Sequence, residues 1–491
     1  MTDKNTSHGR DAMWRVELRN AMPAKERSAI PRAVMPQLDP AFRITNNDEV
    51  NQGLSAEQAV LEATRCLDCP TPTCIEGCPV SIAIPDFIKN IQRENFQEAA
   101  RILKHTSALP AVCGRVCPQE RQCESKCIYN KMKKAPVAIG YLERFAADLQ
   151  RLSGESGNNS SAPSNGIRVA VVGSGPAGLS FAGDMAQRGF EVDVYEALHE
   201  IGGVLKYGIP EFRLPNSVVD AELDALRASG VRFHKDTVIG KTLSYDDLLN
   251  MGFKGLFVAS GAGLPRFMGI PGENLAGVMS SNEYLTRINL MGAGRAGCDT
   301  PVIEGRRVAV IGGGNTAMDS VRTARRMGAT HAMIVYRRSE AEMPARVEEV
   351  EHAKEEGVEF MTLANPVEYI GDEAGRVCAM KVQRMELGEP DASGRRSPQP
   401  IPGAIDTIEV DQVIVSVGVS PNPLIPASID GLDVTGRGTI AVDADMRSSI
   451  PTIFAGGDIV RGGATVILAM GDGRHAAASM ARVLLQNETN N

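Results

Sequence analysis

The sequence of 491 residues is poor in aromatic side chains and has no long apolar stretch. Aromatic residues make up 4% of the chain, with a single tryptophan. No apolar run approaches the roughly 20 residues that span a bilayer, and the polar start of the chain lacks the apolar core of a secretory signal. The net charge of −8 argues against a broad basic surface for nucleic acid. We therefore expect a cytoplasmic protein that binds neither a membrane nor nucleic acid.

Several catalytic patterns are also missing. The seven histidines form no His-Glu-x-x-His motif or other metal-ligand pairing. No cysteine pair lies beside the glycine-rich motifs described below, so a dithiol reductase is not expected. The chain offers no N-terminal cysteine for glutamine hydrolysis and no spare length for a (β/α)8 barrel. Cys298 and Cys378 are isolated, and we expect them to be ordinary thiols.

Eight of the ten cysteines lie between residues 66 and 127. They form two runs, Cys66-x2-Cys69-x4-Cys74-x3-Cys78 and Cys113-x3-Cys117-x5-Cys123-x3-Cys127. Disulfides would need an oxidising compartment, which the polar N-terminus does not predict. Zinc prefers paired Cys-x2-Cys hooks, and only Cys66 and Cys69 form one. The pattern therefore favours iron–sulfur clusters, held in a small α-helical domain over residues 1–150.

The rest of the chain predicts an α/β fold. A polar, Gly/Ser-rich stretch at 151–166 indicates a linker. A β-branched strand over 168–172 then leads into a Gly-x-Gly-x-x-Gly motif and a helical run, and the same pattern recurs after a strand over 307–311. In such motifs the glycines turn the chain, admit a pyrophosphate and let the helix pack on the strand. We therefore predict two Rossmann-like dinucleotide-binding domains after the helical domain.

The first glycine motif predicts a site for FAD or NAD. Its glycines are Gly173, Gly175 and Gly178, and the next strand, over 191–195, ends in Glu196. A carboxylate at that position can accept hydrogen bonds from both ribose hydroxyls and would repel a 2′-phosphate. Near the C-terminus, Asp458 follows a strand and could bind ribityl hydroxyls of a flavin. The helix that starts after Thr465 could turn its N-terminal amides toward the flavin ring.

The second glycine motif predicts a site for NADPH. It contains Gly312, Gly314, Asn315 and Thr316. The strand over 332–336 then ends in an Arg-Arg pair, Arg337 and Arg338, instead of an acid. Two guanidinium groups there favour a 2′-phosphate through charge-assisted hydrogen bonds. The alternative is that the two arginines form a solvated surface pair.

These motifs, with Gly202-Gly203 and the Ala455–Asp458 segment, resemble the flavin disulfide-reductase-like fold, in which the NAD(P)H domain is inserted into the FAD domain. Further motifs resemble the small (β) subunit of bacterial NADPH-dependent glutamate synthase. These are Glu62-Ala63-x-Arg65-Cys66-Leu67, Cys113-Gly114-Arg115-Val116-Cys117-Pro118, Gly140-Tyr141-Leu142-Glu143-Arg144-Phe145 and Tyr207-Gly208-Ile209-Pro210. The resemblance implies an FAD domain over 167–290 and 411–491, with Gly203 among its binding residues, and an inserted NADPH domain over 291–410.

The resemblance also implies two [4Fe-4S] clusters whose ligands cross between the two runs. One cluster would take Cys66, Cys69, Cys74 and Cys127. The other would take Cys78, Cys117, Cys123 and, unusually, Glu143. Cys113 would then hold no iron. The simpler alternative gives each run its own cluster, with Cys113 as a ligand and Glu143 on the surface.

As to activity, the resemblance implies an electron-input subunit. NADPH would reduce FAD by hydride transfer, and the clusters would pass single electrons to a large (α) subunit that makes L-glutamate from L-glutamine and 2-oxoglutarate. We expect a higher-order hetero-oligomer, and no catalytic acid, base or nucleophile from this chain. The alternatives are an NADPH–ferredoxin oxidoreductase, a bifurcating transhydrogenase subunit, and a scaffold without turnover. Glu196 and the Arg-Arg pair argue against a scaffold, which would not need to discriminate between cofactors.

Overall fold

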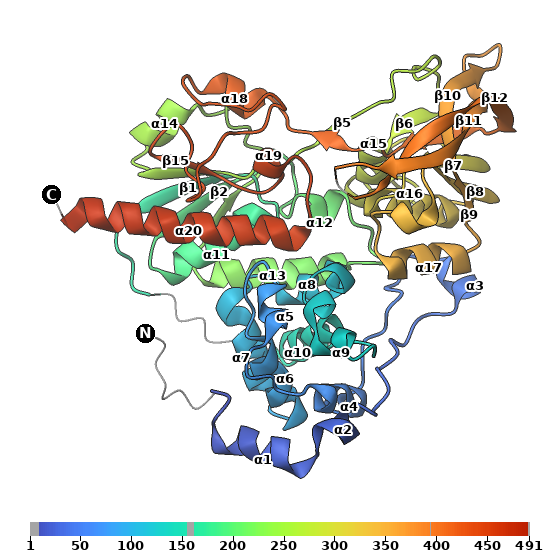
Figure 1. The fold of residues 1–491 in the computed structure, drawn as a ribbon. Coiled ribbons are helices and arrows are strands. Elements are labelled where there is room, and N and C mark those ends of the chain that lie inside the picture. Colours follow the sequence, from blue (N-terminus) through green and yellow to red (C-terminus); the bar gives the residue numbers. More distant parts are fainter. Residues whose placement is uncertain (1–8, 155–161, 393, 490–491) are drawn as a thin grey trace.

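The protein has three parts, which the computed structural model describes over residues 9–154, 162–392 and 394–489 (Figure 1). A bundle of helices, drawn in blue and teal, lies below two α/β domains that stand side by side. The polar start of the chain and residues 155–161 of the expected linker fall outside the described residues. In the described ranges, no helix combines the length and apolar character that a membrane crossing requires.

The lower part confirms the expected helical domain. Its α-helices are α1 (Met13–Ala21), α2 (Ala24–Arg27), α3 (Pro40–Arg43), α4 (Ala56–Arg65), α5 (Thr73–Glu76), α6 (Ile84–Gln92), α7 (Phe96–Thr106), α8 (Pro110–Val116), α9 (Ile128–Lys131) and α10 (Ile139–Leu152). Ile84, Phe87, Ile88 and Ile91 repeat at helical spacing, and all four are buried along one face of α6. Ser55 starts α4 with a capping box. Local sequence therefore explains both the start of α4 and the buried face of α6.

The first nucleotide domain is built on a parallel five-stranded sheet in the order β15-β4-β1-β2-β3. Its strands are β1 (Arg168–Val172), β2 (Glu191–Tyr195), β3 (Arg232–His234), β4 (Gly255–Val258) and β15 (Ile453–Ala455). Its helices are α11 (Pro176–Gln187), α12 (Val204–Tyr207), α13 (Asn216–Ala228), α14 (Tyr245–Asn250), α18 (Leu424–Ser428), α19 (Asp458–Arg461) and α20 (Val466–Thr489). Gly473 lets α20 approach α11, because a Cβ there would lie 2.2 Å from the Ala177 oxygen.

The second nucleotide domain is inserted between β4 and β15. Its parallel sheet has the order β6-β13-β7-β8-β9. The strands are β6 (Val278–Ser280), β7 (Arg307–Ile311), β8 (His331–Tyr336), β9 (Glu359–Thr362) and β13 (Gln412–Val415), with helices α15 (Ser281–Leu285), α16 (Asn315–Arg326) and α17 (Val347–Glu355). The insertion, expected over 291–410, thus has sheet strands on both sides of that range. Two short antiparallel strands, β5 (Leu264–Pro265) and β14 (Val419–Ser420), join the crossing segments.

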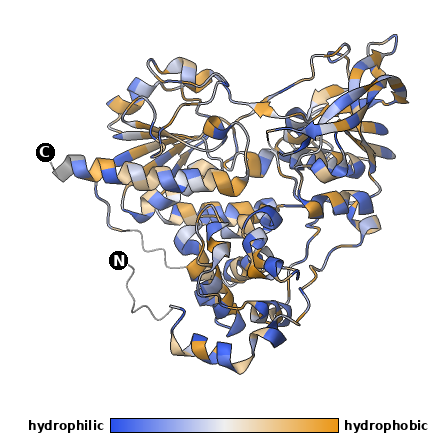
Figure 2. Ribbon diagram, viewed as in Figure 1, coloured by the Kyte–Doolittle hydropathy of each residue, from blue (hydrophilic) through white to orange (hydrophobic). Residues whose placement is uncertain are grey.

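A three-stranded antiparallel sheet adds to the second nucleotide domain, and the sequence did not predict it. It contains β10 (Ala364–Gly371), β11 (Val377–Pro390) and β12 (Arg396–Glu409). Val377, Met380 and Val382 of β11 pack in one hydrophobic cluster with Ile311 and Val413 of the parallel sheet. In Figure 2, both hydrophilic and hydrophobic residues are present along β11 and β12. The sheet therefore buries one side and leaves much of β12 exposed.

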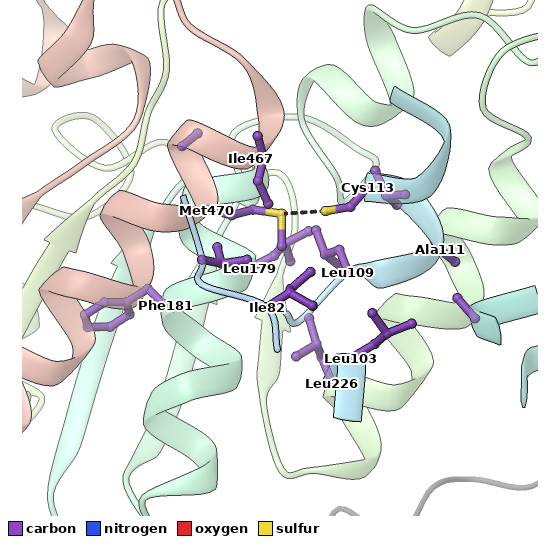
Figure 3. Packing of buried hydrophobic residues seen from close by; sticks show 14 of the residues in the cluster. Ile82, Leu103, Leu109, Ala111, Cys113, Leu179, Phe181, Leu226, Ile467 and Met470 are labelled. Carbon is purple, nitrogen blue, oxygen red and sulfur yellow. Dashed lines mark hydrogen bonds between the residues drawn. The ribbon is translucent and has the colours of Figure 1, made fainter. Parts of the chain in front are cut away.

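The helical domain and the first nucleotide domain share one hydrophobic core. In Figure 3, Leu109 and Cys113 of the helical domain face Leu179 of α11 and Met470 of α20, with Leu226 nearby. Because this cluster is continuous across the boundary, the cysteine-rich domain is fixed against the first nucleotide domain.

Buried ion pairs join all three parts at one place. Arg213 of the first nucleotide domain lies 2.7 Å from Asp319 and 3.3 Å from Glu349 of the second. Arg43, in α3 of the helical domain, lies 2.8 Å from Glu356. All five side chains are buried, and we call them the domain junction.

Candidate cofactor sites

A cavity of about 1290 Å³ lies between the two nucleotide domains. It is lined by six of the seven expected nucleotide-binding residues of the first domain and by two of the six of the second. These are Gly173, Gly175, Glu196, Gly203, Asp458 and Thr465 from the first, and Asn315 and Thr316 from the second. The other expected residues, Gly178, Gly312, Gly314, Arg337 and Arg338, do not line it. A single cavity thus brings a flavin-type site and a nicotinamide-type site together.

The first glycine motif is shaped as its sequence predicts. Gly173 has φ +98°, and a Cβ there would lie 2.5 Å from the Ala259 oxygen. A Cβ on Gly178 would lie 2.0 Å from the Gly173 oxygen, so this glycine serves the close packing of α11. Around Gly175, by contrast, no atom stands within 4 Å of a Cβ position. The open space at Gly175, on the cavity wall at the start of α11, fits a pyrophosphate.

Glu196 is buried and fixed by hydrogen bonds at the end of β2. Its Oε2 accepts from the Ser174 backbone N–H at 2.9 Å and from the Ser174 hydroxyl at 2.5 Å, and its Oε1 accepts from Leu198 N–H at 3.0 Å. Ser174 Oγ in turn accepts from the Gly202 N–H at 2.9 Å. The carboxylate is thereby oriented on the cavity wall, where ribose hydroxyls could reach it. The sequence did not single out Ser174, the variable residue inside the glycine motif.

Asp458 also lines the cavity, at the start of α19. Its Oδ1 accepts from the Ala464 N–H at 2.9 Å. Burial raises the pKa of Asp458, and the Ala464 N–H partly offsets that effect. Behind it, the buried Asp472 accepts from the Gly457 N–H at 3.0 Å and from the Arg461 guanidinium. Asp472 thus fixes the glycine turn before Asp458, and no sequence motif indicated this role.

The second glycine motif also makes a close turn. Gly312 has φ +140°, and a Cβ there would lie 2.3 Å from the Ser416 oxygen. Asn315 Oδ1 accepts from the Arg346 N–H at 2.9 Å, so the start of α16 is tied to the segment before α17. Asn315 and Thr316 line the shared cavity. The motif is therefore placed to bind a dinucleotide that points toward the first domain.

The structure separates the two arginines that follow β8. Arg338 is buried, and its guanidinium donates to the Arg396 oxygen at 2.8 Å and to Asp391 at 2.7 Å. Arg337 is exposed, and no described residue forms an ion pair with it. Consecutive side chains at a strand end point to opposite sides, which explains the difference. Arg337 is thus free to meet a phosphate, whereas Arg338 already holds the β11–β12 hairpin.

Four thiols from both cysteine runs line one small cavity of about 30 Å³. They are Cys66, Cys69, Cys74 and Cys127, and we call them the outer thiol set. All four are partly exposed, and every lining residue of the cavity belongs to residues 66–139 of the helical domain. Burial raises the pKa of Cys69 and Cys74, and the neighbouring thiols raise it further. Thiolates crowded in this way need a compensating cation, which an iron–sulfur cluster supplies.

Buried charged residues support the outer thiol set from behind. Lys89 is fully buried, and its ammonium donates to the Cys66 oxygen and to Gln92 Oε1 at 2.8 Å. Burial lowers the pKa of Lys89 to about 8. Asp68, between two of the thiols in sequence, accepts from Arg19 at 2.6 Å and pairs with Arg15 of α1. The sequence did not single out these residues, which carry no recognisable motif.

The remaining expected ligands lie together deeper in the helical domain. Cys78, Cys117, Cys123 and Glu143 form what we call the inner thiol set. Burial raises the pKa of Cys78 to about 11 and also raises that of Cys123, and contact with Cys113 raises that of Cys117. The negative charge of the nearby Glu143 carboxylate also raises the pKa of all three thiols.

Glu143 has the features of a ligand. It is buried, and none of the described residues forms a hydrogen bond with its Oε1. Burial, followed by the nearby Glu222, raises the pKa of Glu143 to about 8. A buried carboxylate oxygen without a partner is costly unless a metal or cation satisfies it. The group therefore fits three thiolates and one carboxylate around a cluster. In the described ranges, no three His, Cys, Asp or Glu side chains are placed to hold a single metal ion.

Cys113 is directed toward the first nucleotide domain. Its Sγ lies 3.5 Å from Met470 Sδ of α20, as Figure 3 shows, and 3.9 Å from Ser107 Oγ. It is fully buried, and it also contacts Cys117. Cys113 thus forms part of the core between the domains, beside the inner thiol set.

The inner thiol set adjoins the large cavity. Val116, which precedes Cys117, lines that cavity. Gln122, which precedes Cys123, lies with its Nε2 3.5 Å from Thr465 Oγ1 on the cavity wall. The three groups are therefore arranged in series: the nucleotide cavity, the inner thiol set and the outer thiol set.

Family comparisons agree with this division of the chain. Residues 43–155 match the family described as dihydropyrimidine dehydrogenase domain II, 4Fe-4S cluster. Residues 167–473 match the pyridine nucleotide-disulphide oxidoreductase family. Among solved structures, FprA from Mycobacterium tuberculosis in complex with NADPH superposes with a TM-score of 0.57 at 20% identity, over 67% of this chain and 86% of its own. This last likeness shows the fold alone.

Curated relatives match almost the whole chain. The glutamate synthase [NADPH] small chain of Azospirillum brasilense is 38% identical over 90% of this chain and 93% of its own length. The Escherichia coli small chain is also 38% identical, over 87% and 92%. The β subunit of an NADP(+)-dependent formate dehydrogenase of Moorella thermoacetica is 37% identical over 85% of this chain, but over only 61% of its own. The chain therefore belongs to the family of FAD- and iron–sulfur-dependent NAD(P)H oxidoreductases that includes the glutamate synthase small chain.

Proposed function

We propose that this chain is the electron-input subunit of an NADPH-dependent glutamate synthase. Its partner is a large (α) subunit that forms L-glutamate from L-glutamine and 2-oxoglutarate, in a higher-order hetero-oligomer. The observation that carries the proposal is the serial arrangement of nucleotide cavity, inner thiol set and outer thiol set, together with 38% identity to two glutamate synthase small chains. Such an arrangement suits electron export better than a reaction confined to the cavity.

The residues of the cavity bind and orient the nucleotides. Gly175 leaves room for the FAD pyrophosphate, and the Ser174–Glu196 pair receives the adenosine ribose. Asp458 and the start of α20 at Thr465 face the ribityl chain and the flavin ring. When bound, FAD accepts a hydride and releases electrons singly, as an iron–sulfur cluster requires. The protein therefore acts by positioning, and we assign it no catalytic acid, base or nucleophile.

The second glycine motif binds NADPH in this proposal. Gly312 and Gly314 form the close turn before the helix, and Asn315 and Thr316, which begin the helix, line the cavity where the pyrophosphate binds. Arg337 binds the 2′-phosphate, and Arg338 supports it by fixing the hairpin beside it. Arg337→Ala should therefore raise KM for NADPH about tenfold and leave KM for NADH unchanged, as steady-state kinetics can measure. Equal changes for both nucleotides would contradict this assignment.

The two thiol sets each hold a [4Fe-4S] cluster in this proposal. The outer set supplies four thiolates, and the inner set supplies three thiolates and the Glu143 carboxylate. The orphaned Glu143 oxygen supports this assignment over the alternative in which Cys113 completes the inner cluster. Anaerobic purification should give one FAD and about eight irons per chain, apart from those of the partner. Bound zinc without labile sulfide would contradict the cluster assignment.

The decisive experiment for the whole activity is reconstitution with a glutamate synthase large (α) subunit. NADPH oxidation should then depend on both glutamine and 2-oxoglutarate and should yield two glutamates per NADPH. The second candidate is an NADPH–ferredoxin oxidoreductase, since similarity to a formate dehydrogenase β subunit over 85% of this chain shows that such chains are not confined to glutamate synthase. In that case the rate of NADPH oxidation would depend on added ferredoxin and would not change with glutamine.

A further inference from the structure

A group of exposed lysines lies on the helical domain, and one of them borders the outer thiol set. They are Lys25, Lys126, Lys131, Lys133 and Lys134, all exposed, and we call them the basic surface. Lys126 lines the cavity of the outer thiol set. Lys131 ends α9, which starts immediately after Cys127. The basic surface thus lies where the thiols are partly exposed.

Ser28 connects Lys25 of α2 to Lys134 of the basic surface. The Lys134 ammonium donates to the Ser28 oxygen at 2.7 Å and to Ser28 Oγ at 2.9 Å, and Ser28 Oγ donates to the Lys25 oxygen at 2.9 Å. Two segments about 100 residues apart in the chain therefore contribute to one surface.

The charge of the basic surface is not neutralised within the chain. In the described ranges, none of its five lysines forms an ion pair, although ion pairs are frequent elsewhere in the molecule. The nearest acid in sequence to Lys126 is Glu124, which is buried and pairs with Arg32 at 2.8 Å. Glu26 and Glu76 are the exposed acids of the neighbouring α2 and α5. In a chain with a net charge of −8, these five lysines therefore carry positive charge that no described ion pair neutralises.

Exposed apolar side chains accompany these lysines. Met132, between Lys131 and Lys133, is 42% exposed, and Val34 is 82% exposed. The segment of Val34 runs beside the lysines, because Arg32 donates to the Pro136 oxygen at 2.8 Å. Apolar contacts within a charged rim are typical of protein–protein interfaces.

We propose that the basic surface docks the protein that accepts electrons, and that this acceptor carries acidic residues around its own redox centre. The proposal rests on the proposed function, because it assigns the exit of the electrons to the outer thiol set. Each NADPH gives up two electrons as a hydride, so it reduces two one-electron acceptors and releases one proton. Opposite charges would steer the acceptor to the exposed thiols and fix its orientation.

The test compares two double charge reversals in the loaded enzyme. Lys131→Glu with Lys133→Glu changes the basic surface. Lys241→Glu with Lys254→Glu makes the same change in net charge at exposed lysines of the first nucleotide domain and serves as the matched control. The acceptors are an acidic ferredoxin, the basic cytochrome c and the uncharged quinone menadione. NADPH-driven reduction of each acceptor is followed at low and high salt.

We expect the first variant to raise KM for the acidic ferredoxin about tenfold at low salt, with kcat within about twofold. The control variant should leave that KM unchanged, and salt should weaken the wild-type preference for ferredoxin. Reduction of cytochrome c should improve in the first variant, and menadione reduction should not change. Equal behaviour of the two variants, or no preference for ferredoxin over cytochrome c, would overturn the proposal.

Two further measurements distinguish docking from a role of the lysines in tuning the cluster. If the lysines only balance the charge of the cluster, the first variant will shift its reduction potential in a redox titration without changing KM for ferredoxin, and the proposal fails. Lysine acetylation of the complex with the large subunit should spare Lys131 and Lys133 and modify Lys241 and Lys254; full modification of all four would also overturn it. If wild-type enzyme cannot reduce even menadione with NADPH, the proposed function itself is wrong.

Discussion

The outer and inner thiol sets differ both in their side chains and in their surroundings, because the outer set has four thiols and the inner set has three thiols and the Glu143 carboxylate. The outer set is partly exposed, and the buried Lys89 donates to one of its backbone oxygens. The inner set lies against the nucleotide cavity, with the buried carboxylates of Glu143 and Glu222 nearby. Nearby cations favour the reduced, more negative state of a cluster, and nearby carboxylates oppose it. In the proposed function, these surrounding charges favour movement of an electron from the cavity toward the surface.

The largest effect is expected when the inner thiol set loses one of its thiols. Cys117→Ala should eliminate the inner cluster and slow electron transfer to a protein acceptor by more than about 100-fold, because no relay then remains beside the cavity. The iron content of the purified protein should fall by about half, and the flavin should still reduce menadione. Iron analysis and steady-state assays with both acceptors measure these effects. Full iron content with normal export would show that Cys117 is not a ligand.

A second test concerns the Glu143 carboxylate of the inner thiol set. Glu143→Ala should also lower iron by about half, because the inner cluster loses its fourth ligand, whereas Glu143→Cys should restore it. Electron paramagnetic resonance of the reduced protein would show the outer cluster alone in Glu143→Ala. Retention of both cluster signals in that variant would favour Cys113 as the ligand and two separate runs.

The surrounding charge can be changed without touching a ligand. Lys89→Met removes a buried cation next to Cys66 and should lower the reduction potential of the outer cluster on the order of 50 mV. Lys89→Arg keeps the charge and should shift the potential less. A redox titration monitored by electron paramagnetic resonance measures both variants. Identical shifts in the two would mean that packing, not charge, sets the potential.

The mildest effect is expected at Cys113. Cys113→Ala should leave both clusters intact and lower the free energy of unfolding by about 1 kcal/mol, because the contact with Met470 in the shared core is lost. Iron analysis and denaturant unfolding of the loaded protein test the two statements. Loss of iron in this variant would show that Cys113 is a cluster ligand.

Much of the fold could be predicted from local sequence. The strand–glycine–helix pattern located β1, α11, β7 and α16, because the close turns at Gly173 and Gly312 admit no side chain. The β10–β12 sheet was missed, since its strands are only half-buried and follow no single period. The insertion limits were also uncertain in sequence, because β6 and β13 are short strands without a motif.

The residues of the candidate sites also fall into those that the sequence could predict and those that it could not. The positions of Glu196 and Asp458 on the cavity could be predicted, because Glu196 directly follows β2 and Asp458 lies three residues after β15. Ser174, Asp472 and Lys89 were not, because each acts through a partner distant in the chain. Spacing alone could not pair Cys127 with Cys66, since that proximity arises from the packing of the helical domain. The unequal roles of Arg337 and Arg338 likewise depend on a hairpin that the sequence did not predict.

The domain junction has a consequence for how the chain folds and can be divided. Although burial alone would raise it, Arg322 and Arg326 hold the pKa of Glu356 well below its usual range, and Arg43 reaches the same carboxylate from α3. Excising the inserted domain would remove the carboxylate partners of Arg43 and Arg213 and expose the surfaces that it covers on the other two parts. We therefore expect the three parts to unfold as one cooperative unit, so that no fragment of this chain is a self-sufficient module.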